Sequence, residues 1–105
     1  MRKQLYLITI PEDHLNVDLL EVLRPKLIIK DWLVVKHEHA STKPHYHILI
    51  ELYNPLERNT VRLWFKTYMH WVYQPLGDKS ELIAYMLAQS QCVKVIGAKN
   101  EKKAL

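Results

Sequence analysis

The chain has 105 residues, of which 49% are hydrophobic, with two glycines and one cysteine. This length and composition predict one domain with a single compact core; they argue against disorder, a disulfide framework, or a membrane span of about 20 apolar residues. The net charge of +4 favours a polyanionic partner without proving one.

The first half of the chain predicts a strand, a helix and a β-hairpin. Residues 3–10 are rich in leucine, isoleucine and tyrosine and predict a first strand. The chain starts directly on this strand, so no signal peptide is expected. We expect Asn16 to cap a short helix over residues 17–23. Strands over residues 32–39 and 44–52 then form an antiparallel hairpin.

The second half predicts two helices that alternate with two short strands. Asn54-Pro55 is expected to close the third strand, because proline interrupts strand pairing. The elements expected after it are a helix over residues 59–68, a strand over 70–74, a helix over 81–90 and a strand over 92–96. Asp78 or Ser80 is expected to cap the second of these helices.

This order, β-α-β-β-α-β-α-β, predicts an α+β fold. It is the ferredoxin-like or split β-α-β pattern, also found in RRM-like domains, extended by one helix and one strand. We expect a central, mostly antiparallel sheet of five strands with helices packed against it. The domain is expected to cover residues 1–96, and residues 97–105 are expected to form a flexible basic tail.

His45 and His47 are the candidate metal ligands. Side chains two residues apart on a strand project from the same face, so the two imidazoles can hold one divalent ion. A third ligand from the preceding strand would leave positions open for a substrate oxygen and water, as in catalytic metal sites. The sequence offers His37, Glu38 and His39 for this role, and the hairpin register decides which of them faces the pair.

Tyr85 is the candidate nucleophile. It lies in a segment with helical periodicity, residues 81–90. Ile83, Met86 and Leu87 can supply the apolar face of that helix without it, so Tyr85 is not needed for the core.

The strand His45-Tyr46-His47, the strand before it and the helical Tyr85 together resemble the HUH endonucleases. The likeness is greatest to the rolling-circle replication initiators of small plasmids, and it extends to those of circular single-stranded DNA viruses. In plasmid initiators a similar Lys-x-His-Tyr-His strand leads into Asn-Pro and then a helix with Val-Arg. The corresponding residues here are 43–47, 54–55 and 61–62. The resemblance covers the chain from the first strand to about residue 90.

This resemblance implies a site-specific endonuclease and ligase for single-stranded DNA, acting at a replication origin. Two histidines and one further ligand would bind Mn²⁺ or Mg²⁺ and polarise the scissile phosphate. The tyrosine would attack this phosphate, leaving a 5′-phosphotyrosine and a free 3′-OH that primes replication. A host helicase and polymerase are the expected further partners, and no membrane is expected to be involved. The expected location is the cytoplasm of a prokaryotic host or, for a virus, the host nucleus.

The resemblance also ranks the remaining site residues. His37 matches the position of the family's third ligand, and Glu38 is the alternative because a hard cation such as Mg²⁺ prefers oxygen. Viral members carry a lysine three residues after the tyrosine, where this chain has Ala88. Gln89, one turn after Tyr85, could donate a hydrogen bond in its place.

Two other interpretations remain open. A single-tyrosine HUH transposase shares the histidine pair and the helical tyrosine. In the second interpretation, a ferredoxin-like module binds nucleic acid without catalysis, and its histidines are incidental.

Overall fold

The elements follow the predicted order in a computed structural model of the chain. It describes residues 2–15, 17–39, 42–65, 71–73, 78–88 and 92–99. The strands are β1 (Arg2–Pro11), β2 (Ile29–His39), β3 (Thr42–Glu57), β4 (Trp71–Tyr73) and β5 (Cys92–Ala98). The helices are the 3₁₀ helix η1 (Glu12–His14) and the α-helices α1 (Leu19–Leu23), α2 (Arg58–Arg62) and α3 (Lys79–Ala88).

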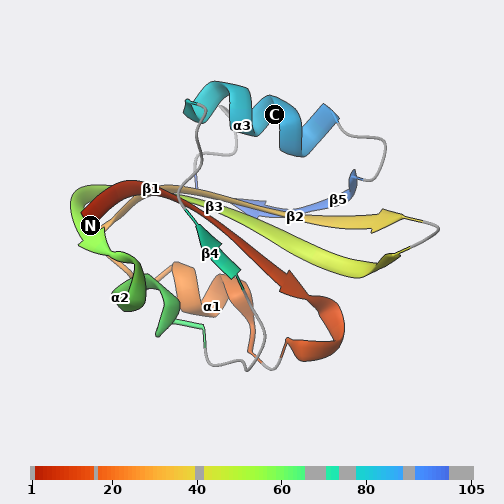
Figure 1. Cartoon of the computed structure of the whole chain (residues 1–105), viewed down its shortest axis with the longest axis horizontal. Coiled ribbons are helices and arrows are strands. Elements are labelled where there is room, and N and C mark those ends of the chain that lie inside the picture. Colours follow the sequence, from red (N-terminus) through yellow and green to blue (C-terminus); the bar gives the residue numbers. More distant parts are fainter. Residues whose placement is uncertain are drawn as a thin grey trace.

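One open sheet joins the strands in the order β4-β1-β3-β2-β5, and every neighbouring pair is antiparallel (Figure 1). Four strands, β1, β3, β2 and β5, make up most of it, whereas β4 pairs with β1 through three residues only. The predicted α+β class with an antiparallel sheet is therefore confirmed, and it is compatible with a ferredoxin-like arrangement. The expected fifth full strand is reduced to a short edge segment.

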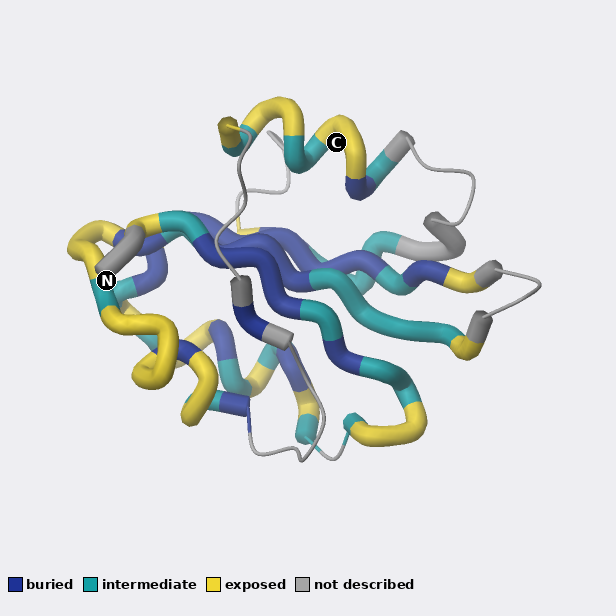
Figure 2. The backbone as a smooth tube through the Cα atoms, viewed as in Figure 1, coloured by how far each residue is buried: buried dark blue, intermediate teal, exposed yellow. Residues whose placement is uncertain are grey.

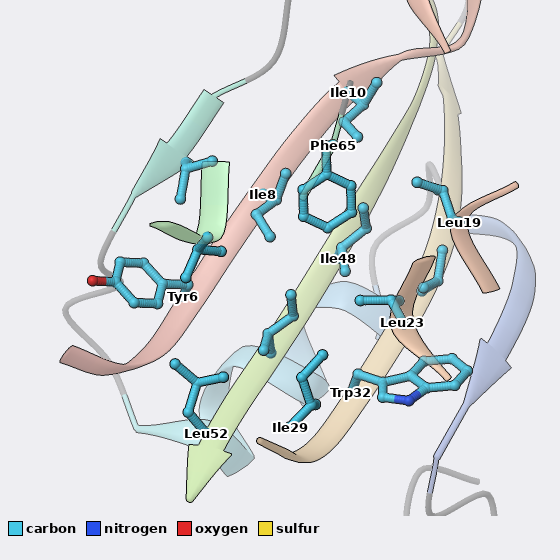
Figure 3. Packing of buried hydrophobic residues seen from close by; sticks show 14 residues of the cluster. Tyr6, Ile8, Ile10, Leu19, Leu23, Ile29, Trp32, Ile48, Leu52 and Phe65 are labelled. Carbon is cyan, nitrogen blue, oxygen red and sulfur yellow. The ribbon is translucent and has the colours of Figure 1, made fainter. Parts of the chain in front are cut away.

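Helices cover both faces of the sheet, with α3 on one face and α1 and α2 on the other (Figure 1). The buried apolar side chains divide in the same way. The larger cluster lies between the sheet and α1 and α2 and includes Tyr6, Ile8, Ile10, Leu19, Leu23, Ile48, Leu52 and Phe65 (Figure 3). The smaller cluster lies under α3 and consists of Leu7, Leu33, Val35, Leu49, Met86 and Ala98.

The N-terminal caps of α1 and α3 are aspartates. Asp18 begins α1, since its carboxylate accepts hydrogen bonds from the backbone N–H groups of Leu20 and Glu21. The predicted cap, Asn16, lies outside the described residues. Asp78 begins α3 and accepts from the Glu81 N–H at 2.9 Å, as predicted. No helix among the described residues has the length and apolar character needed to cross a membrane.

β3 continues past Asn54-Pro55, where the sequence predicted its end. The β1–β3 register shifts here, so that residues 52–55 lie opposite Gln4 alone. Because proline has no N–H to donate, it is tolerated in such a bulge, where the ladder is interrupted. The side-chain amide of Gln4 donates to the Tyr53 carbonyl at 3.0 Å and replaces part of the missing pairing.

α2 is shorter than the helix predicted over residues 59–68. It begins one residue earlier and ends at Arg62, and residues 63–65 form turns and a bend. The rest of that predicted helix lies outside the described residues, as do residues 70 and 74 at the two ends of the strand predicted around β4.

β5 extends to Ala98, two residues into the stretch predicted as a flexible tail. The prediction was wrong there because these residues pair with β2, and the Lys99 N–H also donates to the Trp32 carbonyl at 3.0 Å. A Cβ at Gly97 would lie 3.1 Å from Leu20 Cδ2, so glycine allows α1 to approach the sheet closely. The remainder of the predicted tail lies outside the described residues.

Lys79 fastens the start of α3 to the sheet. Its ammonium lies 2.6 Å from Asp31 Oδ2 and 2.9 Å from Glu51 Oε1, and these two carboxylates face each other across β2 and β3. Asp31 is 8% exposed, so its charge is largely removed from water. Without the lysine, two neighbouring carboxylates would repel each other in a poorly hydrated place.

We predict that Lys79→Met lowers the free energy of unfolding by about 2 kcal/mol. That is less than the roughly 3–5 kcal/mol for breaking a fully buried pair, because Lys79 and Glu51 are partly exposed. Urea denaturation measures the change. The matched control is Lys43→Met, which removes an exposed ion pair with Asp13 and should change the free energy of unfolding far less. Equal losses in the two variants would contradict a special role for Lys79.

Candidate metal centre

Three histidines converge on the α3 face of the sheet. In the β2–β3 register His37 pairs with His45, and Val35 pairs with His47, so all three imidazoles project from one face. One ring nitrogen from each lies within 4.8 Å of the other two. The ring centroids of His37 and His47 are 4.4 Å apart, and those of His45 and His47 are 4.8 Å apart. These three side chains could hold one metal ion.

One ring nitrogen of His37 and one of His45 are each hydrogen-bonded to a backbone carbonyl. His37 Nε2 lies 3.1 Å from the Met86 carbonyl, and His45 Nδ1 lies 3.1 Å from the Lys43 carbonyl. A carbonyl only accepts, so each of these nitrogens must carry the proton, and the other nitrogen of each ring keeps its lone pair. His37 Nδ1 and His45 Nε2 are therefore the available ligand atoms, as in metal sites whose histidines are oriented by outer partners.

The Thr9 side chain is the hydrogen-bond partner of the His47 ring. Its hydroxyl oxygen lies 3.1 Å from His47 Nδ1, because Thr9 pairs with His47 across β1 and β3. A hydroxyl can accept from Nδ1–H, and Nε2 is then the ligand atom. β1, β2 and β3 thus each contribute a side chain to the histidine cluster.

The environment favours neutral imidazoles. Burial, together with the charges of His37 and His45, lowers the pKa of His47 to about 4. Burial also lowers the pKa of His37, an effect that its hydrogen bond to the Met86 carbonyl opposes in part. Because only a neutral imidazole has a lone pair to give, both side chains are suited to metal binding at neutral pH.

The size of the cluster fits a transition metal after small ring rotations. Tetrahedral coordination with metal–nitrogen bonds of about 2.1 Å places the nitrogens about 3.4 Å apart. Nitrogens that start within 4.8 Å of one another therefore need to approach by at most about 1.4 Å. An all-imidazole set is typical of transition metals such as Zn²⁺ rather than of cations that require oxygen ligands.

Glu38 lies on the opposite face of β2 from the cluster. It is exposed, and its carboxylate lies 3.5 Å from the Lys36 ammonium, which also pairs with Glu12. The register therefore brings His37, and not Glu38, to the histidine pair. The His39 side chain and Gln89 lie outside the described residues.

Tyr85 lies on the helix that covers the centre. It directly precedes Met86, whose side chain is fully buried and whose carbonyl accepts the hydrogen bond from His37. Tyr85 itself is 55% exposed, whereas Leu82 and Ile83 pack against the sheet. Its ring is thus accessible from solvent and is not part of the core.

Sequence reasoning missed Thr9, the Met86 carbonyl and the Lys79 ion pairs. Strand alternation does place Thr9 on the same face as Leu7. Its position opposite His47, however, depends on pairing between segments 38 residues apart, for which the sequence carries no local signal. A backbone carbonyl has no sequence signature at all.

No protein-family model matches the chain, and no curated protein matches it at a significant level. The likeness to HUH endonucleases therefore remains one of motif and element order. The histidine cluster and the helix beside it carry the functional conclusion.

We predict that replacing His37, His45 or His47 with alanine weakens Mn²⁺ binding by more than about 100-fold. Each replacement removes a ligand, and even the loss of an outer partner typically costs roughly 10–100-fold. Isothermal titration calorimetry measures the affinity. Glu38→Gln is the matched control, and we expect it to bind as the unaltered protein does. Loss of affinity in Glu38→Gln with retention in His37→Ala would reverse the ligand assignment.

We also predict that the metal-free protein loses stability as the pH falls from 6.5 towards 4. His47 has a folded-state pKa of about 4, below the 6.5 of an ordinary imidazole, so the unfolded chain takes up a proton first. The stability that neutral His47 contributes is complete above pH 6.5 and is lost as the pH falls through the folded-state pKa. Urea denaturation across this range, with His47→Gln as the comparison, measures the difference. An identical pH dependence in both proteins would contradict the prediction.

Proposed function

We propose that this protein is a metal-dependent, site-specific endonuclease and ligase for single-stranded DNA, with the HUH nuclease fold over residues 1–96, that initiates rolling-circle replication. The observation that supports it best is the position of α3. This helix lies over the face that bears the three histidines, and its Met86 carbonyl is hydrogen-bonded to His37, one residue from Tyr85. The proposed metal centre and the proposed nucleophile would thus be connected through the backbone of α3.

In this proposal His37, His45 and His47 hold the cation. Bound there, a divalent metal would neutralise negative charge on the scissile phosphate. Three nitrogen donors favour Mn²⁺ over Mg²⁺, because Mg²⁺ prefers oxygen ligands and loses water reluctantly.

Tyr85 supplies the nucleophile. Its hydroxyl oxygen attacks the phosphorus, a Tyr–O–P bond forms, and the P–O3′ bond breaks. The phenol proton passes to solvent, and the departing 3′ oxygen takes up a proton to become a free 3′-OH. Because the new phosphodiester keeps the bond energy, a later attack by a 3′-OH can reverse the step and reseal the strand. The exposure of Tyr85 gives a DNA strand access to it.

The proposal extends to partners and to one further residue. Single-stranded DNA at a replication origin is the substrate, and a host helicase and polymerase would continue synthesis from the 3′-OH. Gln89 would donate a hydrogen bond near Tyr85, in the place of the lysine that viral initiators carry. The cytoplasm of a prokaryotic host is the proposed location.

A single-tyrosine transposase is the second candidate, because the exposed Tyr85 ring could also reach the site of a partner copy. The two candidates differ in where the tyrosine acts. A mixture of His45→Ala and Tyr85→Phe proteins, each inactive alone, would regain activity only if Tyr85 acts in the partner's site.

We predict that Tyr85→Phe abolishes a covalent protein–DNA adduct while leaving Mn²⁺ affinity and folding unchanged. Only the attacking oxygen is removed, and the ring remains. The assay incubates the protein with Mn²⁺ and a pool of single-stranded oligonucleotides and examines a denaturing gel for a shifted band. Tyr53→Phe is the matched control, since Tyr53 is equally exposed at 56% but lies on β3, and it should still form the adduct.

An adduct that persists in Tyr85→Phe would overturn the choice of nucleophile. If the unaltered protein forms no adduct and binds oligonucleotides equally well with and without EDTA, the protein is a non-catalytic binding module. Recovery of the adduct in the mixture of inactive variants would favour the transposase.

A further inference from the structure

Among the described residues, lysines and arginines gather at the end of the sheet away from the histidines. The segments that meet there are residues 24–30, 53–65 and 98–99, which together carry six lysines and arginines and one carboxylate, Glu57. Around the histidines, residues 11–15, 36–38 and 43–47 carry two lysines and three carboxylates. The lysines near the metal centre are also paired with carboxylates, Lys36 with Glu12 and Lys43 with Asp13.

Two lysine–aromatic pairs lie at this charged end, Lys99 with Tyr53 and Lys26 with Trp64, and we call these four residues together the Tyr53 surface. The Lys99 ammonium lies 5.9 Å from the centre of the Tyr53 ring, and the Lys26 ammonium lies 5.7 Å from that of Trp64. The two pairs are linked through the backbone, because the Tyr53 N–H donates to the Ile28 carbonyl and the Ile29 N–H donates to the Lys26 carbonyl.

Within the Tyr53 surface, Tyr53 and Lys99 are exposed to solvent, and Lys26 and Trp64 are half-buried. Tyr53 is 56% exposed, and two further apolar side chains at this end, Leu27 and Leu63, are 88% and 77% exposed. Figure 2 shows mostly exposed chain where β3 runs into α2. An exposed ring beside lysines can stack on an unpaired base while the lysines contact the flanking phosphates. A duplex would hide its bases from the ring, so a single strand is the better match.

We propose that the Tyr53 surface is a second binding site for single-stranded nucleic acid, separate from the histidine centre. Along β2, His37 is eight residues from Ile29, or about 26 Å at 3.3 Å per residue. Binding at the Tyr53 surface requires neither the metal nor Tyr85, so it holds whether or not the protein cleaves DNA. It would supply the electrostatic attraction that the surroundings of the histidines, with two lysines and three carboxylates, do not.

The test measures binding of a fluorescein-labelled oligothymidylate in EDTA by fluorescence anisotropy. An oligonucleotide of about 20 nucleotides exceeds the roughly 4–16 nucleotides that such surfaces cover. Lys26→Gln with Lys99→Gln should weaken binding by about tenfold and lower the slope of log K against log salt by roughly 1.4, or about 0.7 for each phosphate contact. Tyr53→Ala should weaken it by about fivefold or more, and Tyr53→Phe, which keeps the ring, should not.

Lys36→Gln with Lys43→Gln is the matched control, since it removes the same charge from ammonium groups already paired with carboxylates. Circular dichroism checks that each variant folds. Unchanged binding in the Lys26 and Lys99 double variant, or an equal loss in the control, would overturn the proposal. A duplex of the same length that binds as tightly, with no effect of Tyr53→Ala, would identify a duplex-backbone surface and overturn it as well.

Discussion

The pairing register of β2 with β3 is the constraint on which the candidate site depends. Residues opposite each other in an antiparallel pair share a face, and His37 lies opposite His45. A slip by one residue would turn the side chains of one strand to the other face. His37 would then leave the histidine pair, and Glu38 would take its place. Trp32 and Val34 pack towards α1 and α2, and Leu33 and Val35 pack towards α3, so a slip would exchange these side chains between the two cores.

α3 is held over the sheet at two points that differ in chemistry. Near its start, Lys79 binds the carboxylates of Asp31 and Glu51; near its end, the Met86 carbonyl accepts a hydrogen bond from His37. The second contact joins the helix to a candidate ligand. An ion that rotates the His37 ring would therefore also act on the backbone beside Tyr85. Such support from outer contacts is what holds a reactive group in place.

The lysine- and arginine-rich surface and the histidine cluster lie at opposite ends of the sheet. The histidine end carries a balanced set of ion pairs and imidazoles whose burial favours the neutral form, as Lys36, Lys43 and His47 illustrate. The opposite end carries the excess of lysine and arginine. A polyanion would therefore be attracted mainly to one end, while a metal ion would bind at the other without competition from protonated histidines. This division makes nucleic-acid binding and metal binding separately measurable.

The sequence by itself determined the order of elements and the face shared by His45 and His47, because each follows from periodicity within one segment. It could not determine the continuation of β3 through Pro55 or of β5 through Ala98, since both depend on partner strands distant in the chain. The third histidine, Thr9 and the Met86 carbonyl were likewise decided only by tertiary structure. Strand register is an interaction between segments, and a single segment carries the same alternation in either register.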